Sequence, residues 1–269
     1  MLIADLTSFL RRVAPPDLGL QGDANGIVLG ALKGLERRGV RKVGVSVDVS
    51  LEAVLKAAKQ RVSFLVVHHG LFKQPGGAVG PACAAQLQLI LSNNLTVYCV
   101  GSAWEAAEFG ISEQVAEALG LSVVDLFTIK EDHRLAPIGR ICDWEGGGTA
   151  TLGDVTKRVK MAFGVNPVRR AGREDLAVGR VCVVPGERLT PAMVERAYAQ
   201  DCDCVVTGHA SRECAVAAQY LKVGLVEATH HALDQVGMRR LSNMIALEFP
   251  RDEVTFIPTA GPLDAFEEV

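Results

Sequence analysis

An apolar segment, Phe64-Leu65-Val66-Val67, ends directly at the histidine pair His68-His69, which Gly70 follows. A short apolar segment of this kind is typical of a strand that is buried on both faces, as in a parallel sheet covered by helices. Ligands of open α/β sheets bind beyond the carboxyl ends of the strands. Two neutral imidazoles at such an end therefore predict a metal site. The alternative is a pair of loop histidines that bond to backbone groups or water.

Strand and helix patterns alternate along most of the chain, which predicts an α/β fold. The apolar runs predict strands at 43–47, 64–67, 95–100, 138–142, 180–184, 204–207, 224–228 and 254–257. The helical spacing predicts a first helix that Pro15-Pro16 ends, and helices at about 51–60, 82–92, 111–119, 152–163, 191–199, 210–221 and 237–247. Residues 19–30 are turn-rich, and the pattern is less regular between 122 and 178.

The two halves of the chain repeat one plan. His69 follows the second strand of the first half, and His209 follows the matching strand of the second half. Glu105 and Asp234 follow the third strand of each half in the same way. We therefore expect two related α/β lobes with mixed sheets, which face each other across a crevice that contains the metal site.

The predicted lobes have approximate bounds. The first lobe, 1–125, carries the His-His motif, and the second, 126–269, carries the His-x3-Asp motif. We place the boundary, or a crossing of the chain from one lobe to the other, near 123–135.

The composition is that of a globular protein, with 49% hydrophobic and 22% charged residues. The formal net charge is -3 and no block of five like charges occurs, so nothing calls for a nucleic-acid surface. No apolar stretch reaches the roughly 18 residues of a spanning helix, and the N-terminus lacks a secretory pattern. Seven cysteines, an odd number in apolar contexts, fit a reducing cytoplasm.

A second motif lies at Thr229-His230-His231-Ala232-Leu233-Asp234. His230 and Asp234 are four residues apart, so they share one face of a helix and could grip a single divalent ion. They could equally form a simple charge-assisted hydrogen bond, which is common at this spacing. Glu105 alone is weak evidence, because most acidic residues face solvent.

Together, these positions form a mixed nitrogen and oxygen donor set: His68, His69, Glu105, His230 and Asp234. Such a set suits zinc, manganese, iron or another first-row ion. Bridging carboxylates would also compensate the charge of two divalent ions about 3.5–4 Å apart. A pair of this kind lowers the pKa of a bridging water and supplies a hydroxide nucleophile at neutral pH.

These residues resemble those of the Nif-three-like (NGG-one interacting factor three) family, many of whose members are named GTP cyclohydrolase I type 2. The resemblance is carried by the segments Asn25–Gly30, Asp48, Val66–Gly70, Val97–Gly120, Val206–Gly208 and Ala228–Gly237. It implies two α/β lobes, a dinuclear metal site and a ring-shaped hexamer. Carried over by position, it implies His68, His69, Glu105, His230 and Asp234 as the ligands.

The chain departs from the family pattern at the two acidic ligands. The family usually has Asp where Glu105 stands and Glu where Asp234 stands. We hypothesise that the exchange is partly compensatory, with one ligand longer and the opposite one shorter. The late family histidine usually follows glycine and precedes tyrosine, whereas His230 lies next to Thr229 and His231.

A further departure concerns proton transfer. The family often has His-Thr-Asn-Leu before the first acid, where this chain has Gly101-Ser102-Ala103-Trp104. The imidazole that is missing at Gly101 affects catalysis more than metal binding. His209 and His231 could substitute as proton carriers, or they could have only a polar role at the rim of the site. Glu213 is a further candidate acid–base group.

Three functions are consistent with the sequence. The first is a dinuclear-metal-dependent hydrolase of a nucleotide-like or other small phosphorylated substrate. The second is a non-enzymatic, ring-forming scaffold or regulatory protein that binds metal. A dinucleotide-binding protein is the weakest, because Val184-Pro185-Gly186-Glu187 is not a glycine-rich phosphate loop.

Overall fold

The computed structural model describes residues 1–30, 34, 37–71, 80–131 and 134–261. The chain forms two compact units. Unit 1 comprises Met1–Ala107 and Met238–Val269, and unit 2 comprises Glu108–Gly237. The predicted lobes, 1–125 and 126–269, are a different partition of the chain, and their arrangement stays a prediction.

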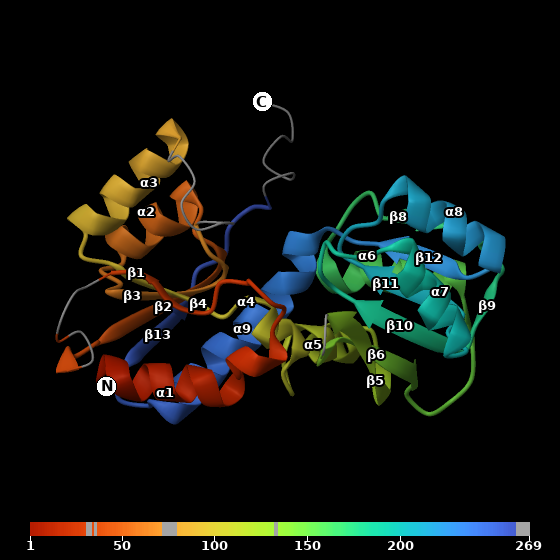
Figure 1. Ribbon diagram of the computed structural model, residues 1–269, viewed down its shortest axis with the longest axis horizontal. Coiled ribbons are helices and arrows are strands. Elements are labelled where there is room, and N and C mark those ends of the chain that lie inside the picture. The colour runs from red at the N-terminus through yellow and green to blue at the C-terminus, as the bar shows by residue number, and fades with distance from the viewer. Residues whose placement is uncertain (31–33, 35–36, 72–79, 132–133, 262–269) are drawn as a thin grey trace. The chain divides into compact units, whose positions relative to one another are not determined.

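Unit 1 is built on a mixed five-stranded sheet in the order β1-β4-β3-β2-β13 (Figure 1). The strands are β1 (Gly26–Leu29), β2 (Lys42–Asp48), β3 (Phe64–His69), β4 (Thr96–Cys99) and β13 (Glu253–Phe256). β13, β2, β3 and β4 are parallel, and β1 is antiparallel to β4 at the edge. All four residues of β4 and the first five of β3 are buried, as expected for a sheet covered on both faces.

Helices cover both faces of this sheet. They are α1 (Ile3–Val13), the 3-10 helix η1 (Pro16–Leu18), α2 (Leu51–Lys59), α3 (Pro81–Ser92) and α4 (Gly101–Ala106). α2 and α3 lie on one face and α1 lies on the other (Figure 1). α2 begins where the Ser50 hydroxyl accepts a hydrogen bond from Ala53 N at 3.1 Å, which is a standard N-cap.

Unit 2 contains a six-stranded mixed sheet in the order β5-β6-β10-β11-β12-β8. These strands are β5 (Leu121–Glu131), β6 (Arg134–Trp144), β8 (Arg169–Ala171), β10 (Arg180–Val184), β11 (Cys204–Thr207) and β12 (Gly224–Glu227). The three central strands β10, β11 and β12 are parallel, and the others are antiparallel to their neighbours. A small ladder joins β7 (Ala150–Thr151) to β9 (Ala177–Val178).

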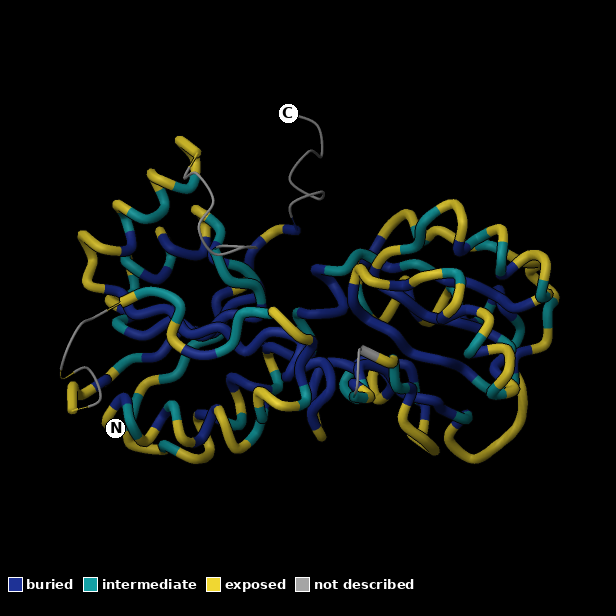
Figure 2. Tube along the Cα trace, viewed as in Figure 1, coloured by how far each residue is buried: buried dark blue, intermediate teal, exposed yellow. Residues whose placement is uncertain are grey.

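The helices of unit 2 are α5 (Ile111–Ala118), α6 (Leu152–Phe163), α7 (Pro191–Ala199) and α8 (Arg212–Leu221), and α9 (His230–Glu248) begins here. α5 packs against β5, β6 and β10, and α7 and α8 pack against each other. α6 starts with a capping box formed by Thr151 and Asp154, and it ends at Gly164 in the left-handed conformation. Figure 2 shows that the central strands of both sheets are buried, whereas the helices alternate between buried and exposed positions.

The mixed α/β fold is confirmed. β2, β3 and β4 form a parallel trio with α2 and α3 as connections, and β10, β11 and β12 form another with α7 and α8. No helix among the described residues has the length and apolar character needed to cross a bilayer. All seven cysteines are free thiols.

Three local expectations were wrong. The turn-rich stretch 19–30 contains strand β1. The segment 123–135, where the sequence predicted a boundary or crossing between lobes, contains most of β5, and that boundary stays a prediction. The sequence did not predict β5, because its pairing with β6 shifts register twice and this interrupts the period-two alternation of a regular strand. The last strand, β13, pairs with β2 in unit 1 and does not close the second half. The last helix begins at 230, seven residues earlier than the expected 237.

Candidate metal centre

The histidine doublet forms the end of β3. His68 and His69 are the last two residues of the strand, whereas the sequence placed them after it. His68 is only 1% exposed and His69 is half-buried. Their ring centroids are 4.2 Å apart with the planes tilted by 54°, so both imidazoles lie in one small region. A buried imidazole at the end of a parallel strand is well placed to be a ligand.

Glu105 lies on the short helix α4, directly after β4 and therefore beside β3. Its side chain is buried, and its Oε1 atom is 3.2 Å from Nε2 of His68. The Cys99 thiol donates a hydrogen bond to the carbonyl oxygen of His68 at 2.9 Å. Burial raises the pKa of Cys99 to about 12, so at neutral pH this group remains a protonated donor. The end of β3 is thus fixed by contacts from the end of β4 and from α4.

Gly101 makes the turn from β4 into α4 possible. Its φ of +53° is in the left-handed region, and a Cβ atom there would lie 2.6 Å from the carbonyl oxygen of Ala24. The 20–25 loop packs against this turn: Ser102 N donates to Asp23 Oδ2 at 2.8 Å, and Ser102 Oγ accepts from Leu20 N at 2.7 Å. The loop therefore occupies the space into which a side chain at 101 would extend.

The first turn of α9 carries two further predicted ligands, His230 and Asp234. Nε2 of His230 is 2.8 Å from Oδ2 of Asp234, which is the predicted one-turn contact. Asp234 is fully buried, and the His230 side chain is 19% exposed. Gly208 permits the close approach of this helix start to β11, because a Cβ atom there would lie 2.8 Å from Cα of His230.

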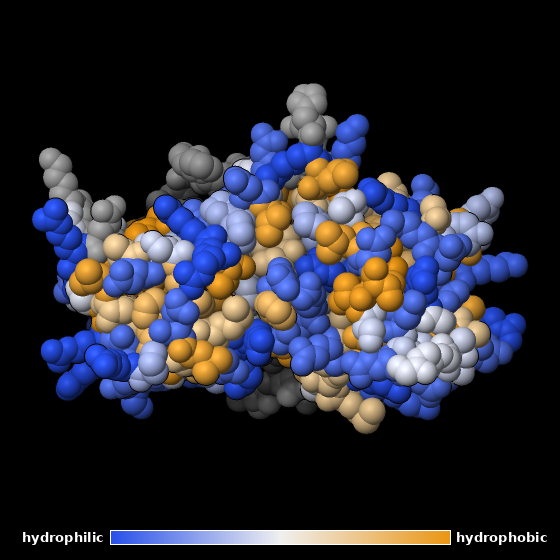
Figure 3. All heavy atoms as spheres, turned by 90° about the horizontal axis from the view of Figure 1, so that it is seen from below, coloured by the Kyte–Doolittle hydropathy of each residue, from blue (hydrophilic) through white to orange (hydrophobic). Residues whose placement is uncertain are grey.

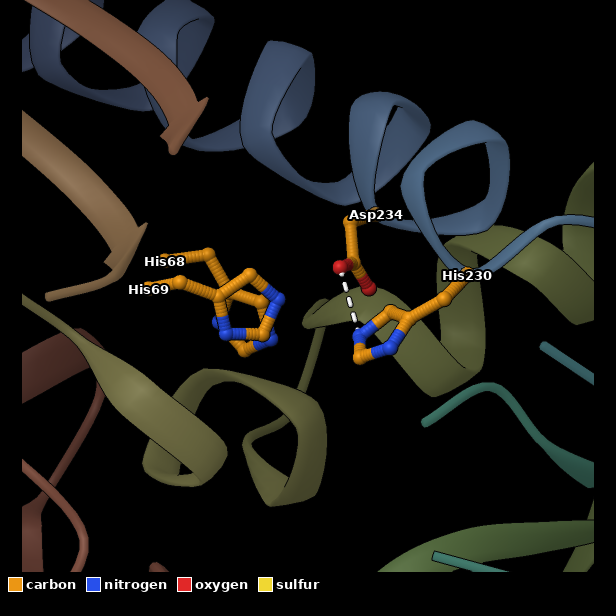
Figure 4. A group of neighbouring side chains, drawn as sticks. All are labelled: His68, His69, His230 and Asp234. Carbon is orange, nitrogen blue, oxygen red and sulfur yellow. Dashed lines mark ion pairs between the residues drawn. The ribbon is translucent and has the colours of Figure 1, made fainter. Parts of the chain in front are cut away.

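Four of the five predicted ligands lie together. His68, His69, His230 and Asp234 each offer one ligand atom, and these atoms all lie within 4.8 Å of one another (Figure 4). Glu105 is outside this group of four and contacts it through His68. Three imidazoles and a carboxylate are a donor set that suits a first-row divalent ion, so the cluster could hold a metal ion. The simple His230–Asp234 ion pair is also present, which is compatible with both interpretations of that motif.

The candidate acid–base groups differ in burial. His209 is exposed, two residues beyond β11, and His231 is buried at 6% exposure. Glu213 is exposed in the first turn of α8, where hydrogen bonds from its own N–H and from the Ser211 hydroxyl lower its pKa. This carboxylate is therefore ionised at neutral pH. None of the three belongs to the group of four ligand candidates, and their catalytic roles stay predictions.

The sequence missed Glu187, whose Oε2 atom is 3.8 Å from Nδ1 of His230. Glu187 lies shortly after β10. This strand belongs to the same parallel trio as β11, which precedes His209, and β12, which precedes His230. The rule that drew attention to those residues, a polar group just beyond a buried parallel strand, would also have selected Glu187.

A family model described as Duf34/NIF3 (NGG1p interacting factor 3) matches residues 1–262. A protein of Methanocaldococcus jannaschii named "GTP cyclohydrolase 1 type 2 homolog" is 23% identical over 91% of this chain and 95% of its own length. A Deinococcus radiodurans protein of the same name is 26% identical over 92% and 88%. Among solved structures, a Bacillus cereus protein related to NIF3 has the same fold, with a TM-score of 0.85 at 18% identity and 98% coverage of both chains.

Proposed function

Because the chain belongs to the Duf34/NIF3 family, we propose that it is a metal-dependent hydrolase of a nucleotide-like or other small phosphorylated compound. The observation that carries this proposal is the group of three imidazoles and one carboxylate within 4.8 Å. The relatives named GTP cyclohydrolase 1 type 2 homolog favour a nucleotide-like substrate. Fold similarity alone would not indicate a reaction, so the donor chemistry bears the main weight.

Two divalent ions would be held by His68, His69, His230 and Asp234, with Glu105 as a second carboxylate. Zinc, manganese and iron all suit these donors. When bound, such ions would supply Lewis acidity that acidifies a water molecule near neutral pH. Two carboxylates would offset part of their charge.

The protein's own residues would orient this centre. Oε1 of Glu105 lies 3.2 Å from Nε2 of His68, and Oδ2 of Asp234 lies 2.8 Å from Nε2 of His230, so each carboxylate would restrict the orientation of its imidazole. Contacts of this kind between carboxylate and imidazole set the tautomer and basicity of ligating histidines. His209, which is exposed, could exchange a proton with solvent, and the ionised Glu213 could accept one.

The proposal is tested by metal analysis and a substrate screen on the same preparation. Elemental analysis of protein purified without chelator should find a first-row metal, and His68→Ala should lose it. Nucleoside triphosphates and phosphodiesters are then offered with added manganese, zinc or iron. Turnover that His68→Ala abolishes supports the hydrolase. Full metal loading without turnover of any substrate would instead favour the non-enzymatic metal-binding scaffold.

We also propose that the chain forms a homo-oligomer, as the family resemblance implies. β5 is an edge strand of its sheet, and it exposes Val123, Val124 and Leu126. Exposed apolar edge strands promote association. Hydrophobic side chains also occur in small groups among hydrophilic ones on the face drawn in Figure 3.

Light scattering measures this association directly. Val124→Lys should lower the molar mass if β5 is in an interface. The control is Val216→Lys on α8, because both valines are 51% exposed. A monomeric parent protein would rule the oligomer out.

A further inference from the structure

A pocket of about 270 Å³ lies in unit 2, outside the group of ligand candidates. Its lining comes from the edge strand β8, from β12 and from the start of α8. The residues that matter for its chemistry are Arg169, Arg170, Ala210, Ser211, Arg212 and Glu227.

The net charge of the pocket lining is positive, because the lining contains three arginines and one glutamate. Arg169 pairs with Glu227 through two guanidinium nitrogens, directly across the β8–β12 pairing. Glu227 also accepts a hydrogen bond from Ala210 N at 2.9 Å. The glutamate thus holds the Arg169 guanidinium and the 210 loop in place at the pocket wall.

Arg212 is the least compensated of the three arginines. Arg169 has Glu227, and Arg170 has Glu174 at 3.8 Å. No ion pair of Arg212 is found among the described residues, and its side chain is exposed. Its guanidinium is therefore available to an incoming anion.

The start of α8 adds to the positive potential. This helix has ten residues, and Ser211 caps it by accepting from Cys214 N. The dipole of a helix favours an anion at its N-terminal end, and Ser211, Arg212 and Ala215 at this end line the same pocket as the other two arginines. A guanidinium group matches the oxygen geometry of phosphate, which makes phosphate the anion of best fit.

We propose that this pocket binds the phosphate group of a phosphorylated small molecule. The identification of that molecule as the substrate rests on the proposed function. Ala210 adjoins His209, and Glu227 is three residues before His230. Three residues span at most roughly 10 Å, so a molecule of nucleotide size held by its phosphate could extend to the first turn of α9.

The test measures phosphate binding to metal-free protein. Inorganic phosphate and pyrophosphate are titrated into the chelator-treated chain, with isothermal calorimetry and ³¹P NMR as readouts. Arg212→Ala and Arg169→Ala should each weaken binding about tenfold, as expected for one charge-assisted contact. Glu227→Gln should bind phosphate a few-fold more tightly, because it removes the competing charge and keeps an acceptor for Ala210 N.

The matched control is Arg173→Ala. Arg173 lies two residues beyond β8, outside the pocket lining, and it pairs with the exposed Asp175. Its removal should leave phosphate affinity unchanged. Equal losses in Arg173→Ala and Arg212→Ala would overturn the proposal, since general surface charge would then explain the binding. Acetate that binds as tightly as phosphate, or no phosphate binding by the natively folded parent, would overturn it too.

The two proposals can fail separately. Phosphate binding in the pocket with no turnover of any substrate would leave the inference standing and remove the hydrolase. If a substrate is found, Arg212→Ala should raise its KM about tenfold and leave the metal content at the parent level. A change in metal content with an unchanged KM would contradict the phosphate role and leave the hydrolase intact.

Discussion

The two parallel trios have the same topology but different chemistry at their ends. In unit 1, the middle strand β3 ends in His68, which is 1% exposed and contacts a buried carboxylate. In unit 2, the middle strand β11 ends in Thr207 and is followed by the exposed His209. The imidazole of unit 1 is thus part of the packed interior, whereas that of unit 2 is open to solvent. The shared topology places an imidazole at or just beyond the end of the middle strand in each trio, and the neighbouring elements determine whether that imidazole is buried.

The largest expected effect is on the buried imidazole. His68→Ala should abolish metal binding and also reduce the free energy of unfolding by about 3 kcal/mol, because it leaves the buried Glu105 without its partner. His209→Ala is the matched control from the other trio and should change neither value by much, since the side chain is exposed. Urea denaturation and elemental analysis measure both. A His209→Ala variant as damaged as His68→Ala would contradict the distinction drawn here.

Alanine substitution of the glycines that follow β4 and β11 should destabilise the protein nearly as much. Gly101→Ala and Gly208→Ala should each cost about 3 kcal/mol, because their added Cβ atoms meet backbone oxygens of Ala24 and Pro185 at 2.6 and 2.1 Å. Gly22→Ala, with a positive φ but open space, should cost only about 1 kcal/mol. Thermal unfolding monitored by circular dichroism compares the three. Equal costs at all three positions would refute the role of close packing.

Exchange of the acids at 105 and 234 tests whether the longer side chain at one position compensates for the shorter side chain at the other. Glu105→Asp and Asp234→Glu should each weaken metal binding about tenfold, the first by withdrawing a carboxylate and the second by crowding a fully buried position. The double variant should bind metal as well as the parent does. Competition with a chromophoric chelator gives the affinities. If either single variant binds as tightly as the parent, the compensation hypothesis fails.

The smallest expected effect is a difference in thiol reactivity. Burial raises the pKa of both Cys99 in unit 1 and Cys142 in unit 2 to about 12, so at pH 8.5 both should remain protonated and inaccessible. Cys83 is the only cysteine that is not buried. Iodoacetamide should therefore label Cys83 first in the native protein, as peptide mass spectrometry can show. Early labelling of Cys99 would mean that the end of β4 opens more readily than its packing implies.

Much of the fold was predictable from sequence because the apolar runs and helix spacings are regular. The helix at 152–163 and the strands at 180–184 and 204–207 were predicted to the residue. β5 was not, because its register shifts break the alternation of buried and exposed residues. The return of β13 to unit 1 was also missed, since strand pairing over long sequence separation leaves no local signal.

The site was predictable to the extent that it follows strand ends. His68, His69, His230 and Asp234 were found by that rule and lie together. The pocket around Arg169 and Arg212 was not found, because it joins an edge strand to a helix start more than forty residues away. No spacing rule connects such positions, and only the pairing of β8 with β12 brings them together.

The turn at Gly101 limits how this chain could change. An imidazole at this position cannot be introduced by one substitution, because the 20–25 loop occupies the space and the backbone is left-handed. A variant that carries a proton-transferring side chain at position 101 would therefore also need a rearranged 20–25 loop.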